Sequence, residues 1–309
     1  SGGGGESVYY PSAQDVLKVK EIIQEASNMP LELIDEIIDF AQYWACSFKR
    51  TLFRQVLQAK TGLTDYGEYG DCNLMVVSLR SMPLGYDPSC GYLNTDGEQS
   101  LYRTKVPKPV FPDSDLSFLE PDTASVLEQW AKHSTPRGKN PCRKIVFTIN
   151  SMERRWGCSP EDHGTYNGNY TWFDVGLERF TALKCGVSEY RMQTEVQRAI
   201  YYASQGRDFY HWLPRPEGRA EWIASINNQT ALLAQKKVHV ITWSFDDNVN
   251  PDSSEGDELE QQGRGRESMT GNFVRSLKLG DVVTVWARAR FRGWRTNVEQ
   301  VKMDIYWAV

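Results

Sequence analysis

The chain lacks the long apolar run that a bilayer-spanning helix needs, which is about 18 to 20 residues. It also lacks the charged and apolar pattern of a secretory signal peptide, although the opening SGGGGE looks like a cloning remnant that could have replaced a native leader. Its six cysteines form no Cys-x-x-Cys pair and no Cys/His cluster, so zinc-site spacing is absent. Scattered cysteines in a chain of 309 residues favour a reducing compartment, and we expect a cytoplasmic or nuclear protein without membrane contact.

Common enzyme signatures are missing as well. The sequence contains no Gly-x-Ser-x-Gly, no His-Glu-x-x-His, no Walker loop and no Gly-x-Gly-x-x-Gly. Histidine is scarce, at four residues, and only His163 stands beside acids, in Glu161-Asp162-His163. These neighbours could support metal-assisted hydrolysis, but adjacent turn residues do not converge automatically, so we favour a turn-stabilising network. We therefore predict that the protein is not an enzyme and that it binds no metal and no cofactor.

The charge balance excludes one more class of partner. The formal net charge of −5 attracts no phosphates, so we predict no nucleic-acid partner. The acidic stretch 246–268 shows no regular spacing of calcium ligands and reads as a long mobile loop.

Aromatic residues, by contrast, are plentiful at 12%, which is typical of β-rich structure. Composition and hydrophobic periodicity along the chain predict a linker over 1–10, a helical module over 11–70 and an irregular bridging region over 71–140. A β-rich region follows over 141–309, with a helical insertion near 181–236. No internal repeat is evident.

The helical module shows clear start signals and a wide apolar stripe. Ser12 and Asp15 resemble a capping box, and a second helix after Pro30 carries acids on its other face. A third helix is predicted over 51–60. Three stripe residues are candidates for contact with a partner protein: Leu33, Ile37 and Trp44.

Residues 280–309 predict two strands joined by a Gly-containing turn. In the first strand Val283, Val285, Ala287 and Ala289 alternate with Thr284, Trp286, Arg288 and Arg290. This period of two predicts one face in the core and one face toward solvent or a ligand. The side chains of the second face either stack on one another as an ordinary cation–π ladder or form a surface that binds a ligand.

Tryptophans and tyrosines in or beside the β-segments form the candidate ligand site. Aromatic platforms with a few polar groups suit a glycan or a peptide, whereas the alternative is that most of these rings belong to the core. The candidate ligand-binding residues are Trp156, Tyr166, Trp172, Trp286, Arg288, Arg290 and Trp294.

Two segments, 143–180 and 238–309, resemble a large group of mostly uncharacterised fungal proteins with a β-rich C-terminal region. That family carries Ser-His-Asp-Gln-Gly-Trp after its first strand and ends in a Trp-Ala-Arg-Ala strand with a Gly-Trp turn. Here the first motif reads Ser151-Met-Glu-Arg-Arg-Trp156, which keeps only the serine and the tryptophan, so a shared ligand is in doubt. The region is similar in pattern to galactose-binding-like jelly-roll sandwiches.

The segment MPLELIDEIIDFAQYW, residues 29–44, resembles the opening of an F-box, with Met29 in place of the usual leucine. The resemblance implies a helical module that docks a ubiquitin-ligase adaptor. We therefore expect an α+β protein, with an N-terminal helical module and an antiparallel jelly-roll-type β-sandwich that has a helical insertion. The expected function is non-enzymatic recognition, in which the module engages a partner protein and the sandwich binds a protein or glycan. The alternatives are a structural scaffold without a small ligand, and a metal-assisted hydrolase that uses Glu161, Asp162 and His163.

Overall fold

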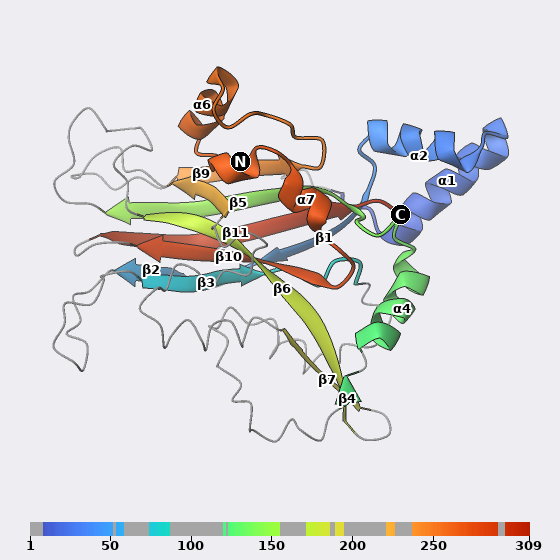
Figure 1. Cartoon of the computed structure of the whole chain (residues 1–309), viewed down its shortest axis with the longest axis horizontal. Helices are drawn as coiled ribbons and strands as arrows, with labels where there is room; N and C mark the ends of the chain where they lie inside the picture. Colours follow the sequence, from blue (N-terminus) through green and yellow to red (C-terminus); the bar gives the residue numbers. More distant parts are fainter. Residues whose placement is uncertain are drawn as a thin grey trace, which may run out of the picture.

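The structure is a computed structural model, and it describes most of the chain. The described residues are 9–51, 54–58, 74–86, 120–121, 123–154, 171–185, 189–194, 221–225, 237–289 and 294–309. They form an α+β protein in which two N-terminal helices precede a largely antiparallel β region (Figure 1). The general class predicted from the sequence is therefore confirmed.

Two helices of the described residues lie near the N-terminus, one lies in the middle of the chain, and three short ones lie between residues 254 and 276. They are α1 (Ala13–Ser27), α2 (Leu31–Phe40), α4 (Thr123–Ser134), α6 (Ser254–Gln261), the 3₁₀ turn η4 (Arg266–Ser268) and α7 (Asn272–Ser276). The strands are β1 (Ala45–Arg50), β2 (Gln55–Gln58), β3 (Leu74–Arg80), β4 (Glu120–Pro121), β5 (Cys142–Arg154), β6 (Thr171–Cys185), β7 (Glu189–Thr194), β8 (Glu221–Ser225), β9 (Lys237–Ser244), β10 (Asp281–Ala289) and β11 (Arg295–Trp307).

The strands build two antiparallel sheets. The five-stranded sheet has the order β1-β11-β5-β9, with β2 also paired to β11. The six-stranded sheet has the order β3-β10-β6-β4, with β7 and β8 also paired to β6. Buried side chains from both sheets, such as Ile145 and Phe147 of β5 and Val283 and Val285 of β10, belong to one hydrophobic core.

The last two strands exist as predicted, but they are not partners. β10 pairs with β3 and β6, whereas β11 pairs with β1, β2 and β5. The chain thus changes sheets between Ala289 and Arg295. A hairpin and such a crossing look alike in sequence, because both need two strands and a turn.

The prediction that one face of β10 is open is wrong. Every residue of β10 is buried, including Trp286 and Arg288. The Trp286 indole N–H donates to the Thr284 hydroxyl at 2.8 Å, and Arg288 forms an ion pair with Asp174 of β6. The period of two therefore separates an apolar buried face from a polar buried face.

The N-terminal helices follow the sequence signals more closely. The capping box of Ser12 and Asp15 is present, and α1 ends at Asn28, whose φ of 51° is left-handed. The helix predicted over 51–60 is wrong for its described part, since residues 55–58 form β2. The preceding segment is also extended, because Ala45–Arg50 pairs with Trp307–Lys302 of β11.

Two further segments differ from the predictions. The 246–268 stretch contains α6 and η4, so the mobile-loop prediction is wrong there. Arg266 bonds to Asp257 and Glu260 at 2.6 Å each, while the buried Arg264 pairs with Asp247. The described residues of 181–236 form strands of the six-stranded sheet, so a helical insertion is wrong for them.

α1, α2 and α4 gather at one end of the sheets, beside the chain's last residue (Figure 1). α6 and α7 lie on another side, above β9 and β5 (Figure 1). Within the described part of the chain, every helix is too short or too polar to cross a bilayer.

Candidate recognition surface on the N-terminal helices

α2 carries apolar side chains on two separate faces. Ile34 and Ile38 are buried in the hydrophobic core, with exposed fractions of 0% and 2%. Leu33, Ile37 and Phe40 are exposed, at 48%, 40% and 94%. A surface helix normally keeps one apolar stripe for its own core, so the second stripe is unusual.

The second stripe has the geometry of a continuous ridge. Leu33, Ile37 and Phe40 stand at positions i, i+4 and i+7, which fall within roughly 60° of one another around a helix of 3.6 residues per turn. The buried Ile34 and Ile38 lie about 110° away around the same helix. We call Leu33, Ile37 and Phe40 the exposed stripe.

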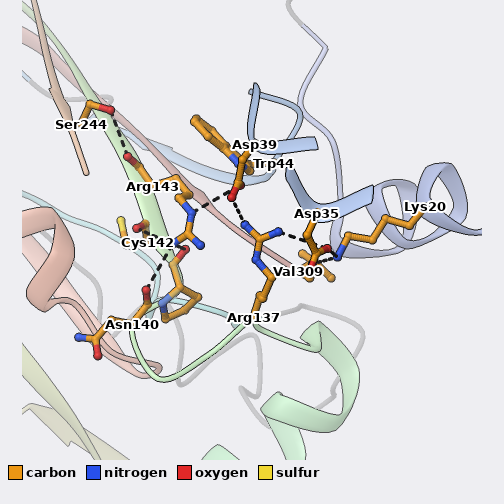
Figure 2. Close-up of polar contacts among 11 residues, drawn as sticks. Lys20, Asp35, Asp39, Trp44, Arg137, Asn140, Cys142, Arg143, Ser244 and Val309 are labelled. Atoms are coloured by element: carbon orange, nitrogen blue, oxygen red, sulfur yellow. Dashed lines mark hydrogen bonds and ion pairs between the residues drawn. The ribbon is translucent and has the colours of Figure 1, made fainter. Parts of the chain in front are cut away.

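Carboxylates on a third side of α2 hold the helix against the rest of the molecule. Asp35 pairs with Lys20 of α1 at 2.5 Å and with Arg137 at 3.2 Å. Asp39 pairs with Arg137 and, at 3.6 Å, with Nε of Arg143 (Figure 2). These groups are buried or half-buried, so we call them the anchor cluster.

The anchor cluster joins segments that are distant in the chain. Arg137 follows α4 and Arg143 belongs to β5, while Lys20 also donates to the backbone oxygen of Val309 (Figure 2). Burial lowers the pKa of Arg143, and the neighbouring Asp39 acts in the opposite direction. Breaking a buried pair leaves a charge without compensation, so such a cluster fixes orientation even where its net stabilisation is small.

Trp44 belongs to this anchor and not to the exposed stripe. Its ring is buried, its indole N–H donates to Asp39 at 2.8 Å, and Phe245 meets it edge-on at 6.1 Å between centroids. Lys144 lies over the same ring at 5.4 Å. The structure thus separates Trp44 from Leu33 and Ile37, the two residues with which the sequence grouped it.

A pocket of about 370 Å³ opens beside the two helices. Leu17, Leu31 and Val309 form apolar walls, while Lys20, Asp35 and Arg137 supply the charged groups. These charged groups already bond to one another within the anchor cluster. The pocket therefore lies on the anchor side of α2 and is separate from the exposed stripe.

The aromatic and arginine candidates of the β region are brought together only in part. Trp172 lies opposite Arg288 in the sheet register, and the guanidinium carbon is 5.8 Å from the Trp172 ring centre. The Trp172 indole N–H donates to Asp174 at 3.0 Å. Trp294 is half-buried and immediately precedes β11. Trp156, Tyr166 and Arg290 lie outside the described residues.

In the described residues no three His, Cys, Asp or Glu side chains gather as metal ligands would. The Glu161-Asp162-His163 sequence lies outside them. Burial raises the pKa of the Cys46 and Cys142 thiols to about 12, which favours the neutral thiol over the nucleophilic thiolate.

Sequence reasoning missed most of the anchor. The acids that the sequence places on the polar side of this helix are Glu32, Asp35, Glu36 and Asp39, but in the structure only the two glutamates are exposed. The spacing of four residues between the aspartates was a signal that they share a side of the helix. The sequence around the two aspartates does not indicate which residue pairs with them, because Arg137 lies 98 residues from Asp39.

The chain matches no family model, no curated protein and no solved structure. Its functional interpretation therefore rests on the residues and their geometry.

Proposed function

We propose that the chain is a non-enzymatic recognition protein whose α2 docks into an apolar groove of a partner protein. The observation that carries the proposal is the exposure of Leu33, Ile37 and Phe40 on a helix whose other apolar face is already buried. Contiguous exposed apolar surface is uncommon on monomeric proteins and is typical of interaction sites.

The spacing of the exposed stripe supports this mode of binding. Helices that bind in grooves place their anchors at i, i+3, i+4 and i+7, and the stripe uses three of these positions. The anchor cluster holds α2 from behind, so little conformational entropy is lost when the helix binds. Leu31 is also exposed, but it lies roughly 150° around α2 from the stripe, beside Asp35 and Lys20, and is not part of the docking face.

The F-box resemblance of residues 29–44 makes a ubiquitin-ligase adaptor the first partner to test. On this proposal the β region is a jelly-roll-type sandwich that binds a protein or glycan target. Two antiparallel sheets with a shared core support the sandwich, and the half-buried Trp172 is the ring that could contact a target. Burial of Trp286 and Arg288 favours the alternative for that region, a scaffold without a small ligand.

Binding of the whole chain to a recombinant adaptor, measured by isothermal titration calorimetry, tests the docking face. Leu33→Asp combined with Ile37→Asp places two charges in the groove, and each lost apolar anchor should cost at least about 2 kcal/mol, or roughly 30-fold in affinity. The control variant carries Val238→Asp and Val240→Asp, which alter two valines on β9 that are somewhat more exposed than Leu33 and Ile37.

The control should bind the adaptor as the unmodified chain does, and circular dichroism should show that both variants fold. Adaptor affinity that is unchanged by the α2 substitutions would remove the F-box-like role. A glycan array probed with the whole chain and with Trp172→Ala tests the β region separately, and an array without a hit would leave a protein target or the scaffold.

A further inference from the structure

The exposed stripe of α2 is bordered by negative charge. Glu32 and Glu36 are exposed on α2 itself and lie roughly 90° around the helix from the stripe. α2 contains no lysine or arginine.

The positive charges of this region point elsewhere. Lys20, Arg137 and Arg143 are committed to Asp35 and Asp39 in the anchor cluster behind α2. The basic side chain of Lys18 bonds to Glu21 at 2.6 Å. Among the residues that the structure describes, no lysine or arginine pairs with Glu32 or Glu36, so a molecule that approaches the stripe meets the negative charge of both.

We infer that the partner groove has an apolar floor and a rim of lysine and arginine side chains. This inference rests on the proposed function and names the chemistry of the partner. Docking removes water from the two glutamates, which is unfavourable unless cations of the partner replace it. Complementary rim charges also accelerate association, by about 10-fold or more at low salt.

The same charges argue against two other occupants. A second copy of this chain, docked through the same face about a two-fold axis, would bring one acidic border near its own duplicate. An anionic membrane surface attracts helices whose polar face carries lysine and arginine, and α2 has neither. A basic-rimmed protein groove is the occupant that fits the charge.

Photo-cross-linking with the whole chain tests the inference. A benzophenone-bearing amino acid replaces Phe40 in the exposed stripe or, as the position control, Phe48, which is exposed on β1. The probe is a clarified extract of the source cells, irradiated at low and at high salt. We expect a protein adduct at position 40 and none at position 48, formed on peptides that contain lysine or arginine.

Charge reversal then separates the inference from the proposed function. Glu32→Lys with Glu36→Lys should lower the adduct yield about 10-fold, as should high salt, because the steering field is lost. Glu255→Lys with Glu258→Lys, on exposed positions of α6, should leave the yield unchanged.

Each other outcome overturns a defined statement. An adduct that survives charge reversal and high salt but disappears with Leu33→Asp would overturn the basic rim and leave the docking face. An absent adduct at position 40 would overturn both. Adducts on peptides of this chain itself, or co-sedimentation of the purified chain with phosphatidylserine vesicles, would replace the partner protein with a second copy or a membrane.

Discussion

The two apolar faces of α2 should differ sharply when each is truncated. Ile34 is fully buried, and removing buried methyl groups costs the lost transfer energy and the cavity left behind. Ile34→Ala should therefore lower the free energy of unfolding by about 3 kcal/mol, within the range measured for such substitutions. Leu33 is about half exposed and has lost less contact with water, so Leu33→Ala should cost less than about 1 kcal/mol.

Urea denaturation followed by far-ultraviolet circular dichroism measures both costs on the whole chain. Hydrogen exchange of the α2 amides should accompany it, because a helix at the periphery can open without global unfolding. Partner affinity should show the opposite order, with Leu33→Ala weakening the complex and Ile34→Ala, once folded, leaving it nearly unchanged. Equal stability costs at the two positions would refute the assignment of one face to the core and one to a partner.

Three other predictions concern buried polar groups. Arg288→Met should destabilise the protein by about 3 to 5 kcal/mol, because it leaves a buried carboxylate without its cation, while the double variant with Asp174→Leu should recover much of that loss. A double-mutant cycle of unfolding free energies, measured in urea, that shows no coupling between Arg288 and Asp174 would contradict this prediction. Burial raises the pKa of Asp304, with Lys302 opposing, so the folded state holds this proton above pH 3.8 and stability falls as pH rises through the raised pKa. The pH dependence of unfolding should therefore be flatter in Asp304→Asn, and identical profiles would refute the shift. Because burial raises the pKa of the Cys46 and Cys142 thiols to about 12, peptide mapping after alkylation at pH 8 should find both unmodified until urea is added. Rapid labelling of the folded chain would show that they are accessible thiolates.

Local signals predicted the elements that depend on local energetics. The Ser12 capping box, the left-handed Asn28 and the apolar pattern of 31–40 are each decided within a few residues, and α1 and α2 form where these signals place them. The apolar residues Ile145, Phe147 and Ile149 alternate with a period of two, which is typical of a strand, and they lie in the centre of β5. Pairing with β11 extends this strand to 13 residues.

Predictions failed where a distant segment determined the outcome. Residues 45–50 look helical by composition, yet they become β1 because β11 provides an edge to which they bond. The 246–268 stretch has few apolar residues, which is typical of a mobile loop, but Arg264 and Arg266 organise its acids into a helix and a 3₁₀ turn. Composition does not reveal such pairing.

Periodicity and capping act within one element, so the residue pattern alone predicts an α+β protein with helices first and antiparallel strands after. The apolar character of α2 is also a property of its residues. Which face of α2 meets solvent depends on packing with distant segments, since the core takes Ile34 and Ile38 while Arg137 and Arg143 draw Asp35 and Asp39 inward. The burial of Trp286 and Arg288 also depends on packing, because a period of two separates side chains by face and does not say what covers each face.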